Sequence, residues 1–196
     1  MTEKSKYSFS CLEQDCPQRV CCTRAHVKVT VSDISRWTEQ EYLPHIVSGL
    51  TLIAPEGEED PITIEALRRP LKRDAQSTAC IFYHEESNAC SIRYSRPISC
   101  RAFPLEYDGT KFRVADKACP GVGKGEVQKE SLREARDTAE QEFKERNETE
   151  RALPGLYAVL MEHMLRQSAE TMKNLTEEDR KQLDEIMSKR SKQQPE

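Results

Sequence analysis

The sequence lacks several features that define common protein classes. It contains no run of about 18 apolar residues, so no membrane-spanning helix is expected. The N-terminal residues MTEKSKYSFSC contain no apolar stretch of the signal-peptide type, which predicts a cytoplasmic protein. The net charge of −4 gives none of the basic excess typical of nucleic-acid binding, so no nucleic-acid partner is expected.

Common catalytic signatures are also missing. Gly121-Val-Gly-Lys-Gly125 lacks the spacing of a phosphate-binding loop and the Ser or Thr that follows its Lys. Neither a dinucleotide-binding fingerprint nor a serine nucleophile elbow occurs. The sequence leaves open whether the protein is an enzyme, and any catalysis would have to use a metal or a thiolate.

Apolar residues are scarce for a chain of this length. Hydrophobic residues make up 36% and charged residues 33% of the 196 residues, which predicts a thin core. Small cores are commonly supplemented by disulfides or by a bound metal.

What the sequence does contain is a concentration of cysteine in its first part. No cysteine follows position 119, and four of the eight fall between positions 11 and 22. Thiolates are soft metal ligands, so clustered cysteines in loop-like segments favour a metal site. The candidate ligands are Cys11, Cys16, Cys21, Cys22, Cys80, Cys90, Cys100 and Cys119.

The expected compartment favours metal over disulfides. Cytosolic thiols stay reduced, and clustered cytosolic cysteines are more often metal ligands or redox groups. A disulfide scaffold and inert buried thiols are the alternatives.

The spacing of the cysteines does not name the metal. The first half reads Cys11-x4-Cys16-x4-Cys21-Cys22, and no C-x2-C knuckle of the zinc type occurs. Iron–sulfur sites accept less regular spacings. If Cys21 and Cys22 were extended, their side chains would point to opposite faces, which suits two four-thiolate sites or one polynuclear site.

A more specific signal lies in the second half. The stretch Cys90-Ser-Ile-Arg-Tyr-Ser-Arg-Pro-Ile-Ser-Cys100-Arg-Ala-Phe-Pro, followed by Cys119-Pro-Gly, resembles the YkgJ-like cysteine-cluster family. That family is described as a zinc- or iron-chelating domain and includes flagellin N-methylase. The resemblance covers about residues 11–123. The family's front motif is C-x2-C-x2-C-C, whereas this chain has four-residue gaps.

The resemblance implies that all eight cysteines are ligand candidates. It implies iron or zinc as the cofactor, and we expect an iron–sulfur cluster or iron slightly ahead of zinc. It also suggests an alternative, a metal-dependent protein-modifying enzyme of methylase type, although no methyl-donor site is visible in the sequence.

Four further side chains lie near the cysteines in sequence. Arg96 and Arg101 flank Cys100, where each could support thiolates or an anionic ligand, or pair with Glu86 or Glu106. His84 and His26 are better explained as surface residues than as ligands.

The predicted fold class is α+β. Alternation of Val27, Val29 and Val31 predicts a strand, and Ser32 is the expected N-cap of the helix that follows. Residues 62–71 are ambiguous between strand and helix. Two hairpins are expected, one joining 81–83 to 91–94 and one turning at Asp108-Gly109.

The C-terminal part has helical periodicity. We expect a cysteine-cluster domain over residues 1–123, helices packing on it over 124–191, and a disordered tail at 192–196. A break is predicted between Asn147 and Pro154, and a third helix from Thr176. The alternative for the apolar stripes is a helix that binds a protein partner.

Overall fold

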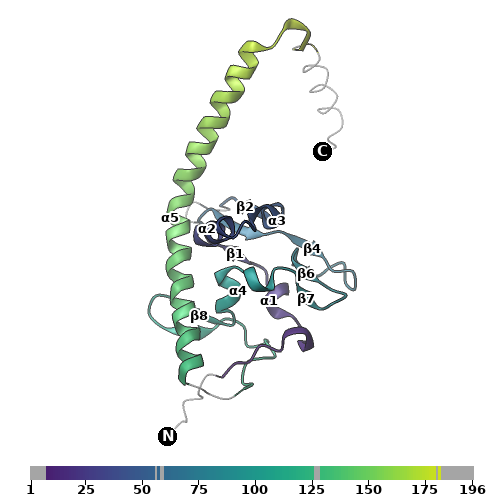
Figure 1. The fold of residues 1–196 in the computed structure, drawn as a ribbon, viewed down its shortest axis with the longest axis vertical. Helices are drawn as coiled ribbons and strands as arrows, with labels where there is room; N and C mark the ends of the chain where they lie inside the picture. The colour runs from purple at the N-terminus through teal and green to yellow at the C-terminus, as the bar shows by residue number, and fades with distance from the viewer. Residues whose placement is uncertain (1–7, 56, 58–59, 126–128, 180, 182–196) are drawn as a thin grey trace. The chain divides into compact units, whose positions relative to one another are not determined.

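The computed structural model describes residues 8–55, 57, 60–125, 129–179 and 181. They form two compact units, residues 1–153 and residues 154–196, within which only the described residues are discussed. Short helices and small antiparallel sheets alternate in the first unit, so the predicted α+β class is confirmed (Figure 1).

The first unit contains one three-stranded sheet and three two-stranded hairpins. The sheet has the order β1-β3-β2, formed by Lys28–Val29, Thr63–Ala66 and Leu50–Ile53. The hairpins pair β4 with β5, β6 with β7 and β8 with β9; their strands are Arg68–Pro70, Thr78–Cys80, Tyr83–His84, Ala89–Cys90, Leu105–Tyr107 and Phe112–Val114.

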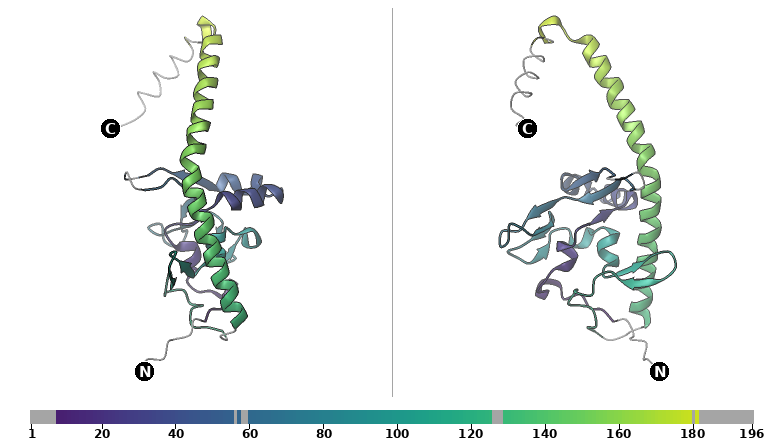
Figure 2. Two further views of the ribbon diagram at one scale, coloured as in Figure 1. Left: turned by 90° about the vertical axis from the view of Figure 1, so that its left-hand side faces the viewer. Right: turned by 180° about the vertical axis from the view of Figure 1, so that it is seen from behind.

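Helical segments connect these strands. The α-helices are α1 (Val20–Thr23), α2 (Val31–Glu39), α3 (Leu43–Ile46), α4 (Ile98–Ala102) and α5 (Lys129–Asn174). Three short 3-10 turns are η1 (Glu13–Asp15), η2 (Val47–Gly49) and η3 (Arg93–Ser95). In Figure 2, α1, α4 and the β6–β7 hairpin lie beside one another below the three-stranded sheet.

The core of the first unit centres on Trp37. This side chain is fully buried among Val27, Ile46 and Ile64, and Cys80 belongs to the same cluster. The thiol-bearing elements are therefore part of the core, and burial of apolar area holds them in place.

The start of α2 differs from the prediction. Its N-cap is Thr30, not Ser32, because Thr30 and Asp33 form a reciprocal capping box. Thr30 accepts from the Asp33 backbone N–H at 3.0 Å, and Asp33 accepts from the Thr30 backbone N–H at 3.1 Å. The strand before the helix is correspondingly short.

The ambiguous segment and the two hairpins are resolved. Residues 62–71 are extended, contributing β3 and β4, and no helix forms there. The hairpin at Asp108-Gly109 is confirmed, with Leu105 opposite Val114. The other hairpin pairs Tyr83 with Cys90 and His84 with Ala89, so its strands lie closer to the turn than the strands predicted at 81–83 and 91–94.

The helix α5 has no break, so the interruption predicted between residues 147 and 154 is wrong. Pro154 lies inside the helix. Proline removes one backbone hydrogen bond, and the flanking turns retain the helical conformation. The third helix predicted from Thr176 and the tail at 192–196 lie largely or wholly outside the described residues.

Up to Leu153, α5 is part of the first unit. Ala139 packs against Ala102 and Leu105 in a small cluster, and Leu153 joins the core around Trp37. This part of the predicted helical cover is therefore present.

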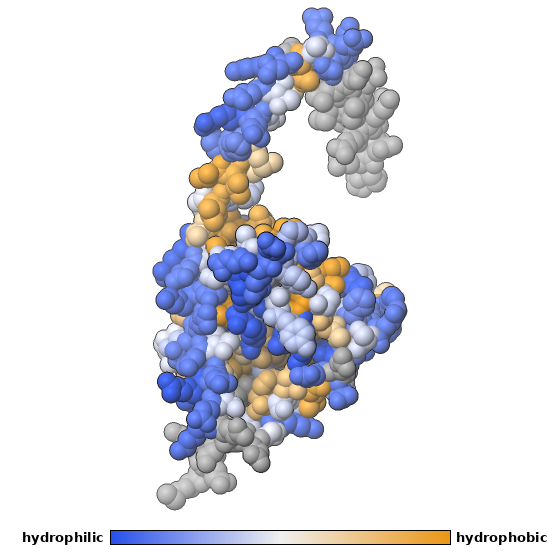
Figure 3. All heavy atoms as spheres, viewed as in Figure 1, coloured by the Kyte–Doolittle hydropathy of each residue, from blue (hydrophilic) through white to orange (hydrophobic). Residues whose placement is uncertain are grey.

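Beyond Pro154, the apolar side chains of α5 are exposed. Figure 3 shows them as an uncovered band, formed by Leu156, Tyr157, Val159, Leu160, Met161, Met164 and Leu165. Val159, for example, keeps 68% of its surface exposed. Even so, no helix among the described residues combines the length and apolar character needed to cross a bilayer.

Candidate metal centre

All eight cysteines are free thiols in the structure. Four come from the N-terminal segment, where Cys11 and Cys16 flank η1, and Cys21 and Cys22 lie on α1. The other four come from β5, β7, α4 and the turn near residue 120; they are Cys80, Cys90, Cys100 and Cys119. Segments far apart in the sequence thus bring the thiols to one region.

Two adjoining cavities divide these thiols. The first, called the thiol cavity below, has a volume of about 40 Å³ and is lined by six of them: Cys11, Cys21, Cys22, Cys80, Cys90 and Cys100. The second, called the arginine cavity, has a volume of about 90 Å³ and is lined by Cys11, Cys16, Cys21, Cys100 and Cys119. Cys16 and Cys119 therefore face only the second cavity.

The adjacent cysteines lie on a helix and not on a strand. The Sγ atoms of Cys21 and Cys22 are 3.8 Å apart and share a hydrogen bond. This bond lowers the pKa of Cys21 to about 6 against the opposing effect of burial, and the positive charge of Arg24 adds to the lowering. The same bond raises the pKa of Cys22, and its burial adds to the rise. The pair therefore shares one proton at neutral pH.

Burial favours the protonated form of Cys80, Cys90 and Cys100 in the thiol cavity when no metal is bound. Burial raises the pKa of Cys80 to about 11. Burial also raises the pKa of Cys90 and of Cys100, and in each case nearby thiolates add to the rise. A cation in this cavity would reverse these shifts, because it stabilises thiolates directly.

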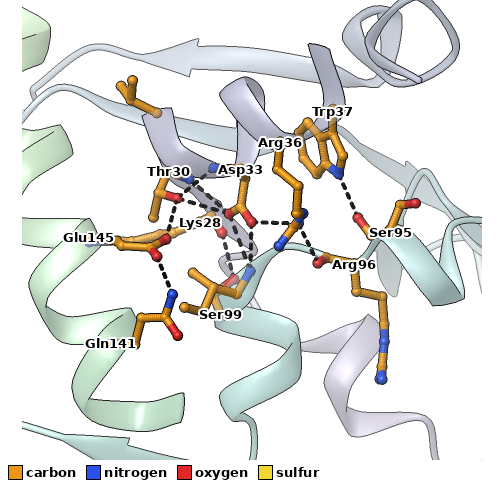
Figure 4. A network of polar contacts seen from close by, with 12 residues as sticks. Lys28, Thr30, Asp33, Arg36, Trp37, Ser95, Arg96, Ser99, Gln141 and Glu145 are labelled. Carbon is orange, nitrogen blue, oxygen red and sulfur yellow. Dashed lines mark hydrogen bonds and ion pairs between the residues drawn. The ribbon is translucent and has the colours of Figure 1, made fainter. Parts of the chain in front are cut away.

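The helix α4, which carries Cys100, is held by a buried carboxylate (Figure 4). Asp33 accepts the backbone N–H of Ile98 at 3.0 Å and also accepts Nη2 of Arg36 at 2.8 Å. Trp37 donates from Nε1 to the carbonyl of Ser95 at 2.7 Å. Arg36 also donates from Nη2 to the carbonyl of Arg96 at 3.0 Å, so residues 95–98 are fixed to α2 at three points.

The N-terminal cysteines are joined to Cys119 by backbone pairing. Phe9 forms a bridge with Val122, and Ser10 donates to the carbonyl of Gly121 at 3.1 Å. A Cβ on Gly121 would lie 2.3 Å from the Ser10 carbonyl oxygen. The glycine of the Cys-Pro-Gly turn is therefore required for this close approach.

Arginine side chains surround the thiols. Arg24 donates from Nη2 to the Cys100 sulfur at 3.4 Å and stacks over Phe103. Arg96 lines both cavities, and in Figure 4 its side chain extends away from the Asp33 network. Arg19, only 4% exposed, also lines both cavities.

Glu86 and Glu106, the partners considered for Arg96 and Arg101, pair with other residues in the structure. Glu86 pairs with Lys72 at 2.7 Å, and Glu106 pairs with Arg113 at 3.1 Å. Both carboxylates thus have other partners, which leaves Arg96 and Arg101 directed to the arginine cavity. Sequence reasoning missed Arg19 and Arg24, although both lie within three residues of the cysteine pair.

Histidine does not line either cavity. His26 lies 3.1 Å from a Glu65 oxygen, and His84 is exposed on β6. Among the described residues, the linings of the two cavities contain neither carboxylates nor imidazoles. Sulfur is therefore the available metal donor.

The thiols line shared cavities but are not positioned to coordinate a single metal ion. Within the part of the chain that the structure describes, no three Cys, His, Asp or Glu side chains are placed to hold a single metal. The donor set fits a soft metal, because at least five thiols share a cavity with no competing donor.

A third cavity, called the outer cavity, lies next to this centre. It has a volume of about 420 Å³, and Arg24, Phe103, Glu142, Phe143 and Arg146 are among its lining residues. Arg24 therefore faces the outer cavity and also contacts Cys100.

Comparison with known proteins identifies the cysteine-bearing region. The model of a family named CxxCxxCC, with the description "Putative zinc- or iron-chelating domain", matches residues 10–120. Neither a curated protein nor a solved structure matches the chain. The matched region contains all eight cysteines and every lining residue of the thiol cavity.

Proposed function

Because the chain belongs to the CxxCxxCC family, we propose that it is a metalloprotein whose cysteine thiolates hold iron, in the form of an iron–sulfur cluster. Metal chelation is the function of the family as described. The choice of iron–sulfur over zinc is our proposal, and so is a redox role in the cytoplasm. In that role the cluster, when bound, supplies one-electron transfer.

The placement of six thiols around one cavity, without three of them set to hold a single ion among the described residues, is the observation that carries this proposal. A tetrahedral zinc site with Zn–S bonds of about 2.3 Å places its sulfurs about 3.8 Å apart. Cys21 and Cys22 have this separation, but among the described side chains no third ligand joins them. A cluster is larger than an ion, so it suits thiolates that surround a cavity at wider spacing.

The chain's own residues support a thiolate cluster in two ways. Cys21, with its pKa of about 6, is largely ionised at neutral pH and can bind a metal first. Arg24 then offsets negative charge at Cys100, to whose sulfur it donates. Binding would also add to folding stability, because a small core holds these loops.

Metal and sulfide analysis tests the proposal. The full chain is purified without oxygen, and its iron, zinc and acid-labile sulfide are measured beside an absorption spectrum. Iron and sulfide in near-equal amounts are expected. Colourless protein with stoichiometric zinc would refute the cluster while leaving metal binding intact.

Single substitutions then identify the ligands. Cys90→Ser and Cys100→Ser are expected to abolish bound iron, because both thiols line the thiol cavity. Cys16→Ser is the matched control, since this thiol faces only the arginine cavity and is expected to retain most of the iron. Equal losses in all three variants would contradict a cluster confined to the thiol cavity.

A second candidate function is a metal-dependent protein-modifying enzyme of methylase type. The outer cavity favours it, because its volume of about 420 Å³ is in the range of small-molecule sites and it adjoins Cys100 through Arg24. Titration of S-adenosylmethionine into the metal-loaded chain distinguishes the candidates. Saturable binding that Arg146→Gln weakens would support the enzyme, and no binding would oppose it.

A further inference from the structure

The arginine cavity has an unusual charge composition. Three guanidinium groups line it, from Arg19, Arg96 and Arg101. Among the described residues, its lining includes no Asp or Glu. Guanidinium groups gathered around one cavity repel one another, and Arg19 among them is buried, so binding of an anion there would be favourable.

Arg19 gives the most direct indication. Its side chain is fixed by a hydrogen bond from Nε to Oδ1 of Asn88 at 3.0 Å. Asn88 in turn donates to the carbonyl of Cys16 at 2.9 Å, which ties it to the cavity wall. The Nη2 atom of Arg19 is buried and has no hydrogen-bond partner among the described residues. A buried donor of this kind calls for an acceptor, which an anion bound in the cavity would supply.

The other two arginines complete the arrangement. Arg96 uses Nε to donate to the carbonyl of Arg93 at 2.9 Å, which orients its guanidinium group. Arg101, the residue that follows Cys100, brings the third guanidinium group to the lining.

We propose that the arginine cavity binds a small tetrahedral oxyanion, of the phosphate class, beside the thiol centre. Guanidinium groups form paired hydrogen bonds with phosphate oxygens, and such charge-assisted bonds are the strongest that side chains make. A volume of about 90 Å³ accommodates one such group and excludes a nucleotide. The oxyanion is either free phosphate or the phosphate group of a small ligand.

The thiolates of a loaded metal centre are the competing explanation for these charges. In that case the arginines would serve only as counter-charges. Cys21 and Cys100 line both cavities, so their negative charge in the loaded state would reach the arginines directly. Oxyanion binding to the loaded protein separates the two explanations.

Calorimetry with inorganic phosphate tests the proposal. The full chain is titrated in its metal-free reduced form and in its metal-loaded form, and one saturable site is expected in both. Arg19→Gln and Arg101→Gln are each expected to weaken binding about tenfold, the loss of one charge-assisted contact. Arg101 is exposed, so its variant keeps the fold if the Arg19 variant does not. Arg133→Gln is the control, because Arg133 is 82% exposed on α5, outside the cavity.

Two results would overturn the oxyanion site. One is the absence of phosphate binding, or a phosphate affinity that Arg101→Gln leaves unchanged. The other is binding to the metal-free form that disappears on loading, which would make the arginines counter-charges. A parallel titration with glycerol 3-phosphate identifies the source, since tighter binding of the ester indicates a phosphate-bearing ligand. Metal content measured on the same samples reports separately on the metal centre.

Discussion

Replacing Asp33 by Ala should destabilise the first unit more than the same change at Asp108. The Asp33 side chain is only 1% exposed and accepts from Thr30, Arg36 and Ile98. Asp33 is the capping-box partner of the N-cap Thr30, and loss of a capping contact costs about 1 kcal/mol. A buried backbone N–H left without an acceptor, here that of Ile98, costs about 1–3 kcal/mol. The expected loss is therefore about 2–4 kcal/mol, a large share of a typical domain stability.

Urea unfolding of the metal-free reduced chain measures this loss. Asp108→Ala is the matched control, because Asp108 also accepts three hydrogen bonds, from Thr110 and Lys111, but in an exposed turn. Asp33→Asn should lie between the two, since it retains an acceptor for Ile98. Equal unfolding midpoints for the Asp33→Ala and Asp108→Ala variants would refute the argument that Asp33 holds α4.

Three further predictions concern other parts of the protein. In metal-free protein, alkylation of Cys21 should follow a pKa of about 6 and be nearly pH-independent above neutrality, whereas a rate still rising at pH 9 would show an ordinary thiol. Gly121→Ala should separate the segment around Phe9 from the turn that follows Cys119, because the new Cβ meets the Ser10 carbonyl. This variant should therefore have a lower melting temperature. Gly155→Ala, with nothing within 4 Å, should raise it. A chain ending at Leu153 should keep its bound metal, as measured by metal analysis, because the matched region ends at residue 120 and the first compact unit ends at Leu153.

The cysteine centre was readable from the sequence because ligand chemistry depends on residue type. Cys90, Cys100 and Cys119 lie in a motif specific enough to indicate a family, and the structure places them beside the N-terminal thiols. Their division between two cavities was not predictable. It depends on tertiary contacts, such as the Phe9–Val122 bridge, that no local pattern encodes.

The errors in the fold share a physical cause. Ser32 is an equally good cap by residue type, and Thr30 is selected because its partner Asp33 also binds Ile98 from a distant segment. Pro154 predicts a helix end by local rules, yet the helix continues on both sides of it. The long-range contact of Asp33 outweighs the local capping preference at Ser32. The helix on both sides of Pro154 outweighs the tendency of proline to end a helix.

The bridge between Phe9 and Val122 has a consequence for biosynthesis. The cysteines at positions 11–22 are synthesised well before Val122, with which Phe9 forms this bridge. At about 5–20 residues per second, the intervening segment takes about 5–20 s to synthesise. During that interval Cys11, Cys16, Cys21 and Cys22 are open to oxidants and to the wrong metal. Correct loading of the nascent protein therefore depends on a reducing environment and on delivery of the metal after the turn at Gly121 has emerged.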